Sequence, residues 1–284
     1  MALATGPSII STKMGFLKSL FGGSDESPEE KKKREAERDF DVLRTDGVRA
    51  LRMGQAEYAV KCFESALALK DDLETRDYLS QALIRADRLG EALEQLRVLH
   101  EAQPENVHIL SLMARVAFMM EDYGLMSELC EKAMLLDKDN AEIVFLYGRA
   151  ALGQHDKVNA VAMFTKAILL DENLADAYLK RGEVLLEMGD VEGAAEDADW
   201  LMERVEGVDD VLLLKAGVLQ AQNNDVAAID VLSKAIDGNP FLTDAYRLRG
   251  AARLRLGDKD GAAEDAQKVL ELNPEEMSHL SGNF

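Results

Sequence analysis

The sequence predicts an all-α protein made of seven consecutive helix-turn-helix repeats. Small, aromatic and proline residues recur at fixed offsets, and six successive copies start 34 residues apart, while the first copy is one residue shorter. Within each copy, apolar residues recur twice at helical spacing, which predicts two amphipathic helices per copy. Repeat positions are counted from the first residue of each copy. The copies begin at Phe40, Leu73, Val107, Ala141, Ala175, Asp209 and Thr243.

The eighth position of every copy carries a small residue. A residue with little or no side chain lets the first helix of a copy approach the second closely. We therefore interpret this position as a packing device between the two helices. The residues are Gly47, Ser80, Ala114, Gly148, Gly182, Ala216 and Gly250.

The sixteenth position of the five later copies carries Asp or Asn. These side chains accept hydrogen bonds from the free N–H groups at a helix start, so this position predicts where each second helix begins. Pro104, Pro240 and Pro274 follow the second helices, in loops where a proline ends a helix without damaging one. The predicted caps are Asp122, Asp156, Asp190, Asn224 and Asp258.

This order of small, aromatic and proline positions resembles the tetratricopeptide repeat, over roughly Phe40 to Glu276. The resemblance implies a right-handed superhelical solenoid that is one continuous core. We predict three parts. Residues 1–38 are a flexible segment with a short amphipathic cluster and a charged lead-in helix, residues 39–276 are the repeat array, and residues 277–284 are a tail.

The composition disfavours several classes of protein. The formal net charge of −20 argues against nucleic-acid binding, because phosphate contacts need clustered Lys and Arg. Cys62 and Cys130 are far apart and form no CxxC pair, which fits a reducing compartment, so we expect a cytoplasmic protein. The histidines show no paired spacing on one helix, so no metal site is predicted. They are His100, His108, His155 and His279.

The amino-terminal segment contains the apolar cluster Phe16, Leu17, Leu20 and Phe21, which is too short to span a bilayer. It also lacks the features of a secretory signal, so we expect no export. The cluster has four open interpretations: contact with a membrane surface, docking on a partner, a disordered start, or cover for the first repeat. If translation began at Met14, the following residues would match the pattern of a lipid acceptor.

No catalytic motif is present in the sequence. Phosphate loops, HExxH metal pairs and GxSxG nucleophile elbows are all missing, so we expect no enzymatic activity and no cofactor. Two Asp-rich stretches, Asp258 to Gly261 and Asp137 to Asn140, resemble the opening of a calcium loop. The closing Glu of such a loop is replaced by Val269 in the first stretch and by Gly148 in the second. We interpret both stretches as helix caps and turns.

The resemblance implies a binding groove lined by the first helices of successive repeats. Positions that face this groove in the family predict a site for a peptide or protein segment. A list of these candidates contains apolar, aromatic and cationic side chains: Tyr78, Leu112, Arg115, Phe118, Phe145, Arg149, Leu179, Lys180 and Leu213.

Three of these candidates are cations in an otherwise acidic protein. Arg115 and Arg149 occupy the same position of adjacent repeats, and Lys180 lies one helical turn from that position in the next repeat. Two interpretations stay open. The cations bind a carboxylate of a partner, since Arg offers forked donors, or they pair with Glu142, Asp176 and Glu183 of this chain.

Some members of the family hold chaperone C-termini through Lys and Asn residues, and this sequence departs from that pattern. The Asn positions hold Val48, Tyr78, Arg149 and Gly217, which disfavours a receptor for chaperone tails. We therefore expect a non-enzymatic scaffold, monomeric or weakly dimeric, that binds a protein segment in its groove. The alternatives are a membrane-associated assembly factor or co-chaperone attached through its amino-terminal segment, or the regulatory subunit of an enzyme complex.

Overall fold

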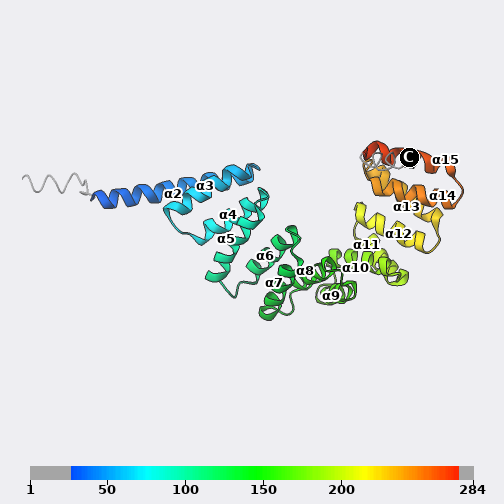
Figure 1. Ribbon diagram of the computed structural model, residues 1–284, viewed down its shortest axis with the longest axis horizontal. Coiled ribbons are helices and arrows are strands. Elements are labelled where there is room, and N and C mark those ends of the chain that lie inside the picture. Colours follow the sequence, from blue (N-terminus) through cyan, green and yellow to red (C-terminus); the bar gives the residue numbers. More distant parts are fainter. Residues whose placement is uncertain (1–26, 275–284) are drawn as a thin grey trace, which may run out of the picture. The chain divides into compact units, whose positions relative to one another are not determined.

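The computed structural model describes residues 27–274 and confirms the all-α prediction. These residues form 14 helices and no strand (Figure 1). The chain divides into two compact units, Met1–Leu99 and His100–Phe284. The first unit contains α2 (Pro28–Arg52), α3 (Ala56–Leu69), α4 (Leu73–Arg85) and the beginning of α5 (Leu89–Ala102).

The second unit contains five helix pairs, each joined by a short turn (Figure 1). The first helices of these pairs are α6 (Val107–Met119), α8 (Ala141–Gly153), α10 (Ala175–Met188), α12 (Asp209–Ala221) and α14 (Thr243–Arg255). The second helices are α7 (Tyr123–Leu136), α9 (Lys157–Leu170), α11 (Val191–Arg204), α13 (Asp225–Gly238) and α15 (Lys259–Leu272).

The charged run that precedes the first repeat forms a single helix with it, α2. This helix starts at a capping box, in which the side chains of Ser27 and Glu30 each accept a hydrogen bond from the other residue's backbone N–H. Pro28 follows at the first helical position, where its ring fixes a φ angle that suits a helix. The apolar cluster from Phe16 to Phe21 and the Met14 start lie outside the described residues.

The second helices begin where the sequence predicts. All five Asp and Asn residues at the sixteenth position are N-caps, and each accepts a hydrogen bond from the N–H three residues further on. Asp156, for example, accepts from the backbone N–H of Asn159 at 3.1 Å. The two calcium-like stretches also contain caps, because Asn140 caps α8 and Asp258 caps α15.

The small residues at the eighth position allow the close helix contact that the sequence predicts. A Cβ atom on Gly148 would lie 2.7 Å from the Phe164 ring, and one on Gly47 would lie 2.6 Å from the Phe63 ring. Both phenylalanines are fully buried. The aromatic side chains of the second helices therefore fill the space that the glycines leave on the first helices.

Successive repeats pack in one recurring way. The first helix of a repeat lies against both helices of the repeat before it: α12 on α10 and α11, and α14 on α12 and α13. Cys130 in α7 and Cys62 in α3 are both buried, and both are free thiols. Burial raises the pKa of Cys130 to about 12, which makes this thiol a packing residue and not a nucleophile.

A row of polar contacts that we did not predict links successive repeats in the second unit. The seventh position of one repeat contacts the twenty-fifth position of the preceding repeat four times in succession. The pairs are Tyr147 with Glu131, Arg181 with Thr165, Lys215 with Asp199, and Arg249 with Ser233. Arg181 and Arg249 also bind the buried Asp197 and Asp265 through two hydrogen bonds each.

The basic residues of α14 are neutralised within the chain. Arg249 and Arg253 share the carboxylate of Asp265, at 2.7 and 2.9 Å, while Arg255 binds both oxygens of Asp225. These three arginines therefore link α14 to its neighbouring helices α13 and α15.

Candidate functional site

Two of the three predicted cationic residues, Arg149 and Lys180, line one pocket in the second unit. The pocket has a volume of about 230 Å³ and collects side chains from α6, α7, α8 and α10, with Arg149 at repeat position nine of α8. Its lining residues are Phe118, Tyr123, Arg149, Leu152, Gly153, Lys180 and Glu183. Three of the residues proposed from sequence, Phe118, Arg149 and Lys180, thus belong to one concavity.

The guanidinium of Arg149 lies over the ring of Phe118. The guanidinium carbon is 3.7 Å from the Phe118 centroid and 5.9 Å from the centroid of Phe145. This stacking holds the guanidinium by one face, while the N–H donors at its edges remain available. Burial lowers the pKa of Arg149, and the nearby charge of Arg115 lowers it further, while the charge of Asp176 acts in the opposite direction without forming an ion pair.

Arg115 is held by an acid of the next repeat. Its Nε donates to Glu142 Oε1 at 3.2 Å, its terminal nitrogen binds the same oxygen, and Ser111 also donates to it at 3.1 Å. The hydrogen bond from Arg115 lowers the pKa of the Glu142 carboxyl. This pair joins α6 to α8.

Lys180 is also paired within the chain. Its ammonium nitrogen lies 2.7 Å from Glu183 Oε2, one turn further along α10. Arg115 and Lys180 therefore follow the internal-pairing alternative. Arg149 differs, because within residues 27–274 it forms no ion pair or hydrogen bond with a carboxylate, and its contacts are with aromatic faces.

The other candidates in the second unit differ in how deeply they are buried. Leu112 and Leu213 are half-buried, whereas Phe145 and Leu179 are buried in the hydrophobic core. The Phe145 ring packs 5.6 Å from the Phe164 ring. Phe145 and Leu179 thus support the walls of the repeats and offer little surface to a ligand.

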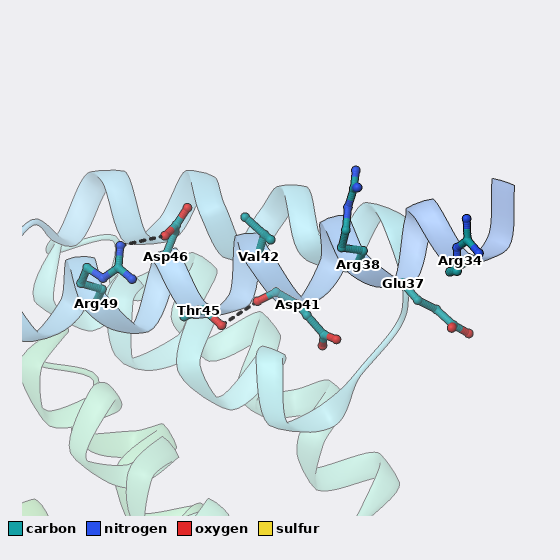
Figure 2. Close-up of a pocket in the computed structure, with 8 residues that line it drawn as sticks. All are labelled: Arg34, Glu37, Arg38, Asp41, Val42, Thr45, Asp46 and Arg49. Atoms are coloured by element: carbon teal, nitrogen blue, oxygen red, sulfur yellow. Dashed lines mark hydrogen bonds and ion pairs between the residues drawn. The ribbon is translucent and has the colours of Figure 1, made fainter. Parts of the chain in front are cut away.

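Tyr78 belongs to the first unit. Its ring stacks on Phe63 with centroids 5.7 Å apart, and its hydroxyl donates to Glu74 at 3.4 Å. A pocket of about 440 Å³ in the same unit is lined by Tyr78, Val48 and polar residues of α2 and α4. A further concavity, of about 600 Å³, is shallow, and all its lining residues lie along α2 (Figure 2).

Four residues of the Arg149 pocket are not among the nine candidates from the sequence: Tyr123, Leu152, Gly153 and Glu183. The Tyr123 ring meets the edge of Phe118 with centroids 6.1 Å apart. A Cβ atom on Gly153 would lie 2.3 Å from the Tyr123 ring, so only glycine leaves room for the tyrosine. Tyr123 starts a second helix, and our candidates came from first helices alone. The sequence feature that could have identified Tyr123 is its aromatic side chain one residue after the predicted cap.

Residues 27–274 contain no cluster of three or more His, Cys, Asp or Glu side chains that could hold a metal ion. None of the helices formed by these residues is long and apolar enough to cross a membrane.

Comparison with known proteins supports the repeat family. Two tetratricopeptide repeat models match the chain, one over residues 179–243 and one over residues 243–276. No curated protein sequence matches the chain.

Solved structures of similar fold include several repeat proteins. A tetratricopeptide repeat protein from Parabacteroides merdae is 16% identical, with a TM-score of 0.69 over 86% of this chain and 97% of that one. PilW, described as a type IV pilus biogenesis factor, is 18% identical, with a TM-score of 0.64 over 71% and 94%.

YrrB, described as having an unusual peptide-binding site, is 18% identical, with a TM-score of 0.54 over 66% of this chain and 96% of that one. At these identities the likeness concerns the fold alone. Together with the matched repeat models and the consecutive packing of helix pairs, it leads to one conclusion: the chain is a tetratricopeptide repeat protein.

Proposed function

We propose that this chain is a non-enzymatic scaffold that binds a polypeptide segment in the Arg149 pocket, and that Arg149 binds a carboxylate of that segment. A role in protein–protein interaction is what the tetratricopeptide repeat fold supports. The finer assignment rests on the residues of the pocket.

The observation that carries the proposal is the state of Arg149. The guanidinium is half-buried, and no carboxylate of residues 27–274 pairs with it. A buried charge without a partner is costly, and a ligand carboxylate that accepts two of its N–H donors would remove that cost. The Phe118 face fixes the plane of the guanidinium before the ligand arrives, so less conformational entropy is lost on binding.

The neighbours of Arg149 define the rest of the ligand. Phe118, Tyr123 and Leu152 supply apolar and aromatic surface, which suits an apolar side chain next to the carboxylate. Glu183 is paired with Lys180, and this ion pair borders the pocket on α10. A second acidic group on that side would meet Glu183, so the pocket suits one carboxylate with apolar flanking residues.

The first experiment is affinity capture from the native lysate with the intact chain and two variants. Arg149→Glu reverses the charge in the pocket. Arg204→Glu is a matched control, because Arg204 also stacks on an aromatic ring, Trp200, with its guanidinium carbon 4.6 Å from the centroid. Both variants have the same net charge. We expect a partner that the wild type and Arg204→Glu retain and Arg149→Glu loses.

The captured segment is then measured directly as a synthetic peptide. Loss of a charge-assisted hydrogen bond is worth about 1.5–3 kcal/mol, so Arg149→Met should weaken binding roughly 10- to 100-fold. Amidation or neutral replacement of the peptide carboxylate should weaken binding to the wild type and leave binding to Arg149→Met nearly unchanged. Equal affinities for wild type and Arg149→Met would contradict the proposal.

A further inference from the structure

The outer face of α9 is apolar. Repeat positions 18, 22 and 29 lie on one side of each second helix, and the residues at these positions are exposed in all seven repeats. In α9 they are Val158, Ala162 and Leu169, which we call the α9 stripe. Val158 is 71% exposed and Leu169 is 81% exposed. Single exposed apolar residues are common, but three on one face of a helix mark a contact surface.

The equivalent residues of the other repeats are mostly acidic. Position 22 is Asp or Glu in five repeats, and position 29 is Asp or Glu in four. The sequence of α9 contains no Asp or Glu, whereas each of the other second helices contains at least two. Among the second helices of residues 27–274, α9 is therefore the only one whose outer face carries no negative charge. The acidic equivalents are Glu94, Glu128, Glu196, Asp230 and Glu264 at position 22, and Glu101, Glu203, Asp237 and Glu271 at position 29.

A lysine beside the α9 stripe has no acidic partner. Lys166 is exposed and pairs with no carboxylate of residues 27–274. Lys157, at the start of the same helix, differs because it binds Glu187 of α10 at 3.0 Å. The outer face of α9 therefore combines apolar side chains with an unpaired cation, in a chain whose net charge is −20.

We propose that the α9 stripe is the surface through which two copies of this chain form a dimer. Together with the half-buried Thr165, its residues are separated by four, three and four positions, which is the spacing of the seam between two coiled-coil helices. A two-fold axis brings the same stripe of both copies together, so the stripe can cover itself. Ala162 and Thr165 are small and lie in the middle of this seam, so the two helices can approach closely.

Electrostatics favour a second copy at this face. Two chains that each carry a net charge of −20 repel one another, and the repulsion is smallest where the facing surfaces carry no acids. The outer face of α9 meets this condition. Lys166 also gains carboxylates on association, because the facing copy carries Glu128 and Glu196 on the second helices of the repeats adjacent to its own α9.

The contact is small, so the dimer is weak. α9 has 14 residues and is about 21 Å long. Two helices of this length bury less than the roughly 1,600 Å² of a standard interface, so we expect a dissociation constant in the micromolar range. The α9 stripe shares no residue with the Arg149 pocket. The dimer therefore does not rest on the ligand proposed for that pocket, and it presents two such pockets to a partner.

Sedimentation equilibrium of the full chain measures the dimer directly. The wild type should change from monomer to dimer between about 1 µM and about 1 mM, and Leu169→Glu should weaken the dimer at least about 100-fold, because it brings two acids together in the seam. Val226→Glu is the matched control. Val226 is 62% exposed at position 18 of α13, so this variant has the same net charge and should dimerise like the wild type.

Two outcomes of this experiment would overturn the proposal. One is a wild type that stays monomeric at about 1 mM. The other is a dimer that Leu169→Glu weakens no more than Val226→Glu does, which would place the contact elsewhere on the chain.

Chemical crosslinking locates the contact without adding a charge. Ala162→Cys places an exposed thiol in the middle of the seam, and both natural cysteines are buried. A short bismaleimide should link two Ala162→Cys chains at least about tenfold faster than two Ala68→Cys chains, because the dimer raises the effective concentration of the seam thiols. Ala68 is exposed on α3, so its variant is the same substitution outside the α9 stripe. Equal rates for the two variants would show that the copies do not meet at α9.

Discussion

At the scale of single residues, Gly148 shows why the repeats need small side chains. Gly148→Ala places a methyl group 2.7 Å from the Phe164 ring, and such overpacking costs about 1–3 kcal/mol. This exceeds the gain of up to about 1 kcal/mol from replacing glycine in a helix. Urea denaturation should therefore show a destabilised protein. Gly238→Ala is the control, because no atom lies within 4 Å of its new Cβ and the stability should not fall.

Glu142 gives a residue-level prediction for pH. Arg115 lowers the pKa of Glu142 in the folded protein below its ordinary value of 4.5. Between these two pKa values the unfolded chain binds more protons than the folded chain, so stability falls with falling pH. The stabilisation is complete above the ordinary pKa and is lost as the pH falls through the folded pKa.

The pKa of Glu142 can be followed by carboxyl NMR titration. In Arg115→Met it should rise toward its ordinary value, while Arg97→Met should leave it unchanged, because Arg97 pairs with Glu94 in the other unit. A pKa that is the same with and without Arg115 would contradict the assigned cause.

At the scale of elements, the polar contacts between repeats differ in strength. The Asp197 carboxylate is only 1% exposed and is held by Arg181, so Arg181→Met leaves a buried charge without its partner. Such a loss costs about 3–5 kcal/mol. Lys215→Met removes a cation at the same repeat position, but its partner Asp199 is 60% exposed, so we expect a loss below about 1 kcal/mol.

The double variant Arg181→Met/Asp197→Ala separates the lost ion pair from lost packing. It removes the buried charge, so chemical denaturation should show it to be more stable than Arg181→Met alone. A double variant that is less stable than the single one would mean that Asp197 supports the fold through its other contacts.

At the scale of the whole molecule, the excess of acidic residues dominates the electrostatics. The chain has 53 Asp and Glu against 33 Lys and Arg. Repulsion among like charges destabilises a compact chain. At 0.1 M ionic strength, salt largely screens the repulsion between exposed charges that lie more than about 10 Å apart. The midpoint of thermal unfolding should therefore rise with sodium chloride and rise equally with potassium chloride. A fall would show that the surface ion pairs contribute more than the repulsion.

The sequence by itself determined the repeating elements of this protein. Helix starts follow from local chemistry: Asp156 caps the helix next to it in the chain, whatever the rest of the fold does. The small residue at position eight also predicts its role, because the two helices of every repeat approach each other closely at this position. The all-α repeat architecture was predictable for this reason.

The tertiary structure decided how the candidate residues are partnered. Arg115, Arg149 and Lys180 have equivalent chemistry in the sequence, yet Arg115 binds Glu142, Lys180 binds Glu183, and Arg149 stacks on Phe118. Which partner a long side chain finds depends on the distances between helices, and the repeat spacing leaves those distances undetermined. The burial of Phe145 and the exposure of Leu169 have the same origin, because exposure depends on which neighbouring helix is present.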